Sequence, residues 1–449
     1  MSKDIRIKKG LDIKLVGGAE KTTKGISLSS VYAIQPENFH GITPKLVAKE
    51  GTEVKTGDTL FYSKSDERIL FPSPVSGKVI EVVRGARRKV LAIKIAADSA
   101  QEYKDFGTKD ATNMSADEVK DHLLAAGCWP FIKQRPYDVV ANPNDTPKAI
   151  FVSAYASAPL AADIDYTLAG KESVLQAALT AVSKLTEGEV HVSVGKNDNS
   201  PFSDLKGIEL HKVSGPHPIG NVGTQIAHID PINKGEVVWV VSPQDLLVIG
   251  ELLLTGQLNL ARTVALTGSQ FSKPQYVTAI AGATIADITA SNLRNDNTRI
   301  ISGNVLSGTQ VKEEGFLGFY DNQITAIPEG DDYEFFGWNK PVFNKISTSR
   351  ALTFSWLTPN KKYDLNTNTN GEHRAFVVTG SFEKVFPLDL YPMQLLKAFM
   401  IKDLDEMEAL GGYEVAPEDF ALTEFICVSK QPHQKIIREG LDLMREELG

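Results

Sequence analysis

Cysteine is scarce in this chain of 449 residues, which holds only Cys128 and Cys427. Two cysteines cannot form a disulfide framework, and so low a number is typical of a protein from a reducing compartment. A [4Fe–4S] cluster takes four cysteine ligands, so these two cannot hold one. Free cysteines are often buried, and we predict that Cys427 belongs to a hydrophobic core.

Long apolar runs and targeting signals are also missing. The most apolar stretch, Val237 to Leu254, is interrupted by Pro243 and Glu251, whereas a membrane-spanning helix needs about 20 mostly apolar residues. The basic N-terminus lacks the apolar segment of a secretory signal. We therefore expect no transmembrane segment, and any role at a membrane requires a partner.

Motifs for nucleotide, metal and nucleophile chemistry are absent too. The chain contains no G-x-G-x-x-G, no P-loop and no G-x-S-x-G sequence. Its eight histidines include no pair four residues apart, which argues against a metal site. The net charge of −8 argues against nucleic acid, because phosphate binding needs a basic face. We predict no catalytic, cofactor-binding or metal-binding residue.

What is present indicates a soluble chain of about three domains, with 42% hydrophobic and 23% charged residues. Short β runs separated by glycine turns occupy 46–95 and predict an all-β module. From Ser115 onward, helices alternate with strands, which predicts an open α/β sheet with parallel pairing. The helices are expected at 116–127, 172–185 and 244–256, and the strands at 149–154, 189–194 and 237–241.

Other segments follow other patterns. Residues 5–16 alternate as one strand does, and 262–329 return to short strands around a helix at 285–293, as in a compact α+β module. Helical spacing of apolar residues predicts a helix over 392–410 that Gly411 ends. A last helix carries its apolar face at Ile437, Leu441, Met444 and Leu448.

One loop is a candidate site, with Gly215, Pro216, His217, Gly220 and Gly223 following a short strand. Loops at the carboxyl ends of strands are where open α/β sheets bind ligands. The His217 ring can hydrogen-bond a quinone carbonyl or a phosphate, and we expect it in a cleft between the α/β module and the 262–329 module. A rigid structural turn explains the same glycines and prolines, so both interpretations stay open.

A basic turn is a second candidate, with Arg84, Arg87 and Arg88 close together. Such a cluster can face anionic lipid or an acidic partner. A solvated hairpin turn accounts for it equally well.

Residues 51–88 resemble the biotinyl and lipoyl carrier fold, through Gly51-Thr-Glu-Val-Lys-Thr-Gly-Asp and Phe71-Pro-Ser-Pro-Val-Ser-Gly. Carriers place the modified lysine eight residues before the second proline, Pro74 here. That position is Asp66, and Lys64 is out of register. A carboxylate cannot form the amide bond to biotin or lipoate, so we expect the carrier fold without its chemistry.

Motifs along nearly the whole chain resemble the A subunit of the Na+-translocating NADH:quinone reductase (Na+-NQR). They are Gly10-Leu-Asp-Ile, Arg84-Gly-Ala-Arg-Arg, Arg135-Pro-Tyr, Ala149-Ile-Phe-Val-Ser-Ala, Pro159-Leu-Ala-Ala-Asp, Ser214-Gly-Pro-His-Pro-Ile-Gly, Ala227-His-Ile-Asp-Pro-Ile, Arg299-Ile-Ile-Ser-Gly-Asn-Val-Leu-Ser-Gly, Phe316-Leu-Gly-Phe-Tyr-Asp-Asn-Gln and Phe386-Pro-Leu-Asp-Leu-Tyr-Pro-Met-Gln-Leu-Leu.

This resemblance implies a peripheral subunit on the cytoplasmic side of the bacterial inner membrane, docked on the integral membrane B subunit. The complex oxidises NADH, reduces a ubiquinone- or menaquinone-type quinone and exports Na+. Its flavins and iron–sulfur centre lie on other subunits, so we expect no cofactor on this chain. The family has been associated with quinone binding.

More distant relatives are the C subunit of the Rnf complex and the flavin-binding NADH subunit of complex I. In them a module called SLBB precedes a cysteine cluster, whose positions are Gln431, Gln434 and Ile437 here, so the cluster is lost. The implied fold is a multidomain α/β and all-β protein. Its expected parts are a barrel-sandwich hybrid module (1–105), a Rossmann-like α/β module (106–260), an SLBB, β-grasp-like module (261–330) and a mostly helical C-terminal region (331–449).

Two alternatives compete with this interpretation. A stand-alone NADH- or flavin-binding electron-transfer subunit would keep the fold, but the glycine-rich flavin loop and the clusters are absent. A carboxyl carrier or transferase component is opposed by Asp66 at the lysine position.

Overall fold

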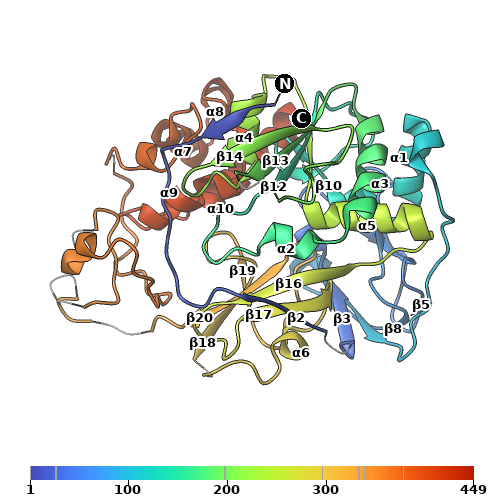
Figure 1. Cartoon of the computed structure of the whole chain (residues 1–449), viewed down its shortest axis with the longest axis horizontal. Coiled ribbons are helices and arrows are strands. Elements are labelled where there is room, and N and C mark those ends of the chain that lie inside the picture. Colours follow the sequence, from blue (N-terminus) through green and yellow to red (C-terminus); the bar gives the residue numbers. More distant parts are fainter. Residues whose placement is uncertain are drawn as a thin grey trace.

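The computed structural model describes residues 2–25, 28–196, 199–295, 297–331, 334–337, 340, 342–350, 352–377 and 379–449. In Figure 1 the α/β sheet lies at the top, the SLBB sheet at the bottom and the barrel-sandwich strands at the lower right, while the orange segments that follow the SLBB module extend to the left and the red C-terminal helices lie beside the α/β sheet. No helix among the described residues combines the length and apolarity needed to cross a bilayer.

The α/β module is built on a mostly parallel sheet. Its strands are β1 (Asp4–Arg6), β10 (Ile132–Arg135), β11 (Val139–Val140), β12 (Ile150–Ala154), β13 (Val190–Gly195), β14 (Glu209–Ser214) and β15 (Val238–Val241). Its helices are α1 (Ala116–Ala125), α2 (Ile164–Leu168), α3 (Glu172–Val182), α4 (Val222–Ile229) and α5 (Pro243–Thr255), with 3-10 turns η3 (Ala111–Asn113), η4 (Trp129–Phe131) and η5 (Ser183–Leu185). The strand order is β1-β14-β13-β12-β15-β10-β11, with only β10 and β11 antiparallel to their neighbours. The predicted α/β alternation is confirmed.

Local capping explains two of these helices. Ser115 Oγ accepts from Glu118 N at 3.2 Å and Glu118 Oε2 accepts from Ser115 N at 2.7 Å, a reciprocal capping box at the start of α1. Ser242 caps α5 by accepting from Asp245 N, and Gly256 ends α5 with a φ of +73°, which glycine adopts without steric cost.

The N-terminal segment joins two modules instead of forming one strand over 5–16. β1 pairs in parallel with β14 of the α/β sheet, and β2 (Glu20–Gly25) pairs in parallel with β17 (Gln275–Ile280) of the SLBB sheet. Figure 1 shows this dark-blue segment running from one sheet to the other. The predicted long strand was wrong, because its pairing with β14 ends at Arg6 and Leu15 instead forms an isolated bridge with Tyr363.

The barrel-sandwich module has two small antiparallel sheets. Their strands are β3 (Val31–Ile34), β4 (Pro44–Leu46), β5 (Glu53–Val54), β6 (Thr59–Ser63), β7 (Leu70–Pro72), β8 (Gly77–Arg84) and β9 (Val90–Ala97), with turns η1 (Pro36–Asn38) and η2 (Ala86–Arg88). They pair in the orders β3-β9-β8-β5 and β4-β6-β7. Phe61 and Phe71 stack with ring centroids 4.4 Å apart, and Phe39 packs edge-on against both.

The SLBB module is a mixed sheet with a short helix, as the sequence predicted, although the helix ends at Thr289 and not at 293, because Ala290 leaves the helical conformation. Its elements are β16 (Ala261–Thr267), β17, α6 (Ile285–Thr289), β18 (Thr298–Ser302), β19 (Thr309–Val311) and β20 (Gln323–Pro328). The strand order is β19-β18-β20-β16-β17-β2, with β2 at the edge.

Among the described residues of the C-terminal region, α-helix begins at Pro392, and the earlier part holds two 3-10 turns, so the region is less helical than predicted. Its elements are η6 (Leu352–Leu357), η7 (Phe382–Lys384), α7 (Pro392–Ile401), α8 (Leu404–Ala409), η8 (Gly412–Glu414), η9 (Pro417–Phe420), α9 (Ala421–Ile426) and α10 (His433–Leu448). The predicted helix over 392–410 is broken, because Lys402 adopts φ +58° and the Asp403 carboxylate caps Glu406 N. The last helix is confirmed, with Ile437, Leu441 and Met444 buried, while Leu448 is exposed.

Candidate functional site

The loop 215–221 joins β14 to α4 at the carboxyl edge of the parallel sheet, and Gly223, the last residue of the predicted set, lies in the first turn of α4. His217 is only 3% exposed, and its Nδ1 lies 3.0 Å from Ser157 Oγ. The same hydroxyl accepts from Gly220 N at 2.8 Å, so the loop is fastened to the chain that follows β12. Burial lowers the pKa of His217 to about 4, and the imidazole is therefore neutral at pH 7.

The N-terminal segment covers this loop. Asp12 Oδ1 accepts from His217 N at 2.9 Å, and His217 O accepts from Leu11 N at 2.8 Å. A Cβ on Gly10 would lie 2.2 Å from His217 O, and one on Gly215 would lie 2.6 Å from Ile7 O, so both positions need glycine. The Pro216 ring lies on the Gly10 side of the loop. These partners differ from the SLBB module that the sequence led us to expect beside His217.

Gly223, the last residue of the predicted set, packs against a buried ion pair. A Cβ there would lie 2.4 Å from both Arg135 Nη1 and Asp419 Oδ1. Arg135 Nη1 donates to Asp419 Oδ2 at 2.9 Å, and Arg135 Nη2 donates to Glu418 Oε1 at 2.8 Å. This contact fastens β10 of the α/β module to η9 of the C-terminal region.

A groove of about 710 Å³ lies between the SLBB module and the C-terminal region. Its lining is mixed, with apolar side chains beside carboxamides and a few charges. Asp12 also lines it, so one residue both borders the groove and accepts a hydrogen bond from the His217 loop. The sequence did not predict this site, because its walls come from segments far apart in the chain and no local motif marks it. Lining residues include Leu11, Ile301, Leu306, Phe425, Val428, Gln310, Gln431 and Gln434.

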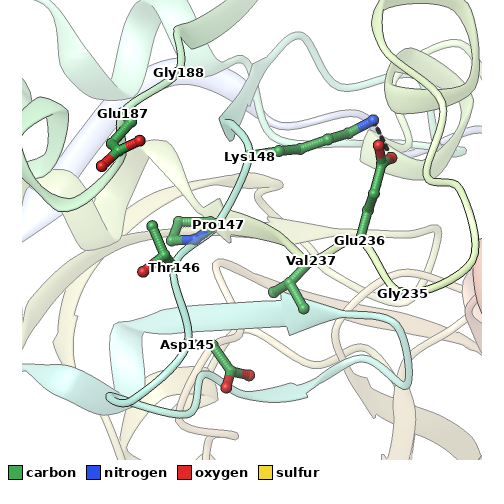
Figure 2. Close-up of a pocket in the computed structure, with 9 residues that line it drawn as sticks. All are labelled: Asp145, Thr146, Pro147, Lys148, Glu187, Gly188, Gly235, Glu236 and Val237. Carbon is green, nitrogen blue, oxygen red and sulfur yellow. Dashed lines mark hydrogen bonds and ion pairs between the residues drawn. The ribbon is translucent and has the colours of Figure 1, made fainter.

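A second pocket, of about 590 Å³, is open and polar. Figure 2 shows the Lys148 side chain reaching Glu236, and Lys148 Nζ also lies 3.0 Å from Asp230 Oδ1. Lys148 precedes β12 and Val237 precedes β15, so the pocket lies at the amino ends of these parallel strands. Open sheets bind ligands at the opposite edge. With its lysine already held by two carboxylates, this pocket is better explained as a structural contact.

Comparison with known proteins gives matches along most of the chain. Family models match residues 5–98 as the NqrA N-terminal barrel-sandwich hybrid domain, 114–258 as the NqrA second alpha/beta domain and 263–313 as the NQRA C-terminal domain. A Rhodopirellula baltica protein, named as the A subunit of Na(+)-translocating NADH-quinone reductase, is 35% identical over 98% of both chains. The chain belongs to this NqrA family. Proteins of the same name from Neisseria meningitidis serogroup B and Serratia proteamaculans are 35% and 34% identical, over 99% of this chain and 100% of theirs.

Solved structures add little to this assignment. An NAD+-reducing [NiFe]-hydrogenase chain matches at 12% identity with a TM-score of 0.38, covering 75% of this chain and 64% of that one. A likeness at this level supports no conclusion about function.

Within this NqrA-family chain, Gln431, Gln434 and Ile437, where the sequence comparison predicted a lost cysteine cluster, make packing and hydrogen-bond contacts. Gln434 Nε2 donates to Leu306 O at 2.9 Å, Gln431 Oε1 lies 3.2 Å from His373 Nε2, and Ile437 is buried. Cys427 is buried too, as predicted. The amides of Gln431 and Gln434 thus join the tail to neighbouring segments along the groove.

The carrier-like turn and the basic turn both lie at the protein surface. Asp66 lies between β6 and β7, where its carboxylate pairs with Arg68 at 2.6 Å. Arg87 and Arg88 are exposed at the turn between β8 and β9, and so is Arg84 at the end of β8. Arg84 Nη1 donates to Arg88 O at 3.2 Å, which holds the turn together. None of the three arginines lines the groove.

Proposed function

We propose that this chain works as the peripheral A subunit of a respiratory Na+-translocating NADH:quinone reductase, on the cytoplasmic side of the inner membrane. The observation that carries the proposal is 35% identity over 98% of the chain to a protein of that name. The chain is thus a subunit of an oxidoreductase that couples NADH oxidation and quinone reduction to Na+ transport. We do not expect the isolated chain to be catalytic.

The docking partner in this proposal is the integral membrane B subunit. The groove between the SLBB module and the C-terminal region is the best candidate surface, because apolar side chains such as Phe425 and Val428 are exposed there. Asp12 connects the groove to the His217 loop. This shared residue supports a quinone-proximal position for the loop containing Gly215, Pro216, His217, Gly220 and Gly223.

The redox cofactors are assigned to other subunits. Cys128 and Cys427 are both buried, and they lie in different modules. The loop after β14 also fastens to the α/β sheet through Ser157 instead of presenting a glycine-rich phosphate cradle. These features support a chain that contributes contacts and position to the complex, not an electron carrier.

The decisive experiment purifies the tagged chain from gently solubilised native membranes and records an absorption spectrum of the chain expressed alone. We expect polytopic membrane subunits with NADH:quinone activity in the purified material and a colourless isolated chain. A yellow or brown soluble protein without membrane partners would instead support a stand-alone NADH- or flavin-binding electron-transfer subunit.

The proposed position of the His217 loop near the quinone is tested separately with the His217→Ala variant. We expect weaker quinone affinity or reduced assembly, because the substitution removes the contact with Ser157 that fastens the loop. His122→Ala, on α1 of the same module, is the matched control. If His217→Ala leaves both quinone affinity and assembly unchanged, the loop has no role at the quinone site.

A further inference from the structure

An arm beyond the SLBB module exposes large apolar side chains to solvent. We call the described residues between 334 and 362 the aromatic–basic arm. The exposed fractions of these side chains lie between 54% and 83%, and large apolar groups that gather in one exposed region mark interaction surfaces. The side chains are Phe335, Phe336, Phe343, Trp356 and Leu357.

The same arm is basic within an acidic protein. The sequence from 334 to 362 contains one carboxylate and five cations, a net charge of +4, whereas the whole chain carries −8. The single carboxylate, Glu334, is already paired with Lys345. Lys361 Nζ lies 5.8 Å from the centre of the Phe343 ring, so charge and aromatic surface adjoin. The cations are Lys340, Lys345, Arg350, Lys361 and Lys362.

This combination of groups distinguishes a lipid surface from a protein surface. Protein interfaces are enriched in arginine and aromatic residues but depleted in lysine, and four of the five cations here are lysines. Clusters of basic residues attract anionic headgroups, and tryptophan and phenylalanine side chains enter the interface beside them. Both features fit a membrane surface.

We propose that the aromatic–basic arm lies on the anionic headgroup surface of a bilayer, with Phe343 and Trp356 inserted at the interface and Lys340 and Lys362 over the headgroups. The proposal rests on the peripheral position proposed above and adds a direct lipid contact to it. It also assigns lipid contact to the arm and not to the basic turn with Arg84, Arg87 and Arg88. In Figure 1 the arm lies on the left and β8, which leads to the Arg84 turn, on the right, so the two surfaces are well separated.

The test measures binding of the full-length chain to phosphatidylcholine vesicles with and without phosphatidylglycerol, by co-flotation. We expect binding only to the anionic vesicles, and weaker binding at high salt. The Lys340→Gln/Lys362→Gln variant should bind about 25-fold more weakly, at about fivefold per lysine. Phe343→Ser/Trp356→Ser should also lose affinity. The matched controls, Lys49→Gln and Leu254→Ser, change exposed side chains in other modules and should bind as the wild type does.

Three outcomes would overturn the inference. These are equal binding to neutral and anionic vesicles, arm variants that bind as the wild type does, and loss of binding only on substitution of Arg84, Arg87 and Arg88. Purification of each variant from native membranes tests assembly with the membrane subunits independently of vesicle binding, so failure of the lipid contact and failure of the proposed function can be told apart. If an arm variant keeps vesicle binding but no longer co-purifies with a polytopic subunit, the arm is a protein interface. If arm variants fail to bind vesicles yet all co-purify, both proposals stand.

Discussion

The buried ion pair between Arg135 and Asp419 permits a quantitative test of how the α/β module is joined to the C-terminal region. The Arg135 side chain is 2% exposed and that of Asp419 is fully buried. Burial opposes the charge of Arg135, but Asp419 and Glu418 together raise its pKa above the ordinary value. Arginine is therefore always charged here, and removing it leaves a buried carboxylate without its counter-ion.

We expect Arg135→Met to lower the free energy of opening at this contact by about 3–5 kcal/mol, the usual cost of an unpaired buried charge. Asp419 would then keep its hydrogen bond from Ala416 N at 2.8 Å. Asp419→Leu should cost less, because Arg135 retains Glu418 at 2.8 Å. The double variant Arg135→Met/Asp419→Leu should be more stable than Arg135→Met alone, since the fully buried carboxylate is gone and the one that remains, Glu418, has a side chain that is 37% exposed.

Hydrogen exchange of the peptides covering β10 and 416–426 measures this opening locally, which suits a multidomain chain that need not unfold in one step. Lys435→Met is the control, because its i,i+4 pair with Glu439 is exposed. The reasoning fails if Arg135→Met exchanges as slowly as the wild type, or if the double variant is as destabilised as the sum of the single ones.

Three further predictions follow from other contacts. Gly10→Ala should destabilise the chain by about 1–3 kcal/mol in chemical denaturation, because φ at Gly10 is +146° and the new Cβ would lie 2.2 Å from His217 O. The control is Gly18→Ala, which should be near neutral because the space around Gly18 is open. Burial lowers the pKa of His433 to about 4, below the unfolded value of about 6.5, so its contribution to stability is present above pH 6.5 and is lost as pH falls toward 4. A pH series of unfolding midpoints should be less steep in this window for His433→Gln, and an equal slope would contradict the assignment. Mass spectrometry of the purified chain should find no lipoyl or biotinyl adduct, since Asp66 occupies the lysine position; an adduct on any lysine would refute that alignment.

Local sequence signals were enough to predict a helix or strand where its formation depends on residues within the element itself. The helix predicted from residue 116 is confirmed as α1, and the structure shows Ser115 and Glu118 making reciprocal bonds at its start. Alternating strands and helices predicted the parallel sheet, and the family motifs predicted the barrel-sandwich and SLBB modules that the comparisons show. The domain limits stay predictions. In these cases hydrogen bonding and burial follow from residues close in sequence.

Tertiary structure decided the features that depend on partners distant in the chain. Ile5 and Ile7 are buried in the α/β core, while Ile13 and Leu15 are buried against the C-terminal region, so one alternating pattern serves two cores and not one strand. The contacts of His217 could not be predicted from the sequence either, because Asp12 and Ser157 come from distant parts of the chain. The sequence by itself determined the family, the modules and the composition of the arm. Only the folded chain decided which modules the N-terminal segment joins and where the groove lies, because burial is set by contacts between segments that no local pattern specifies.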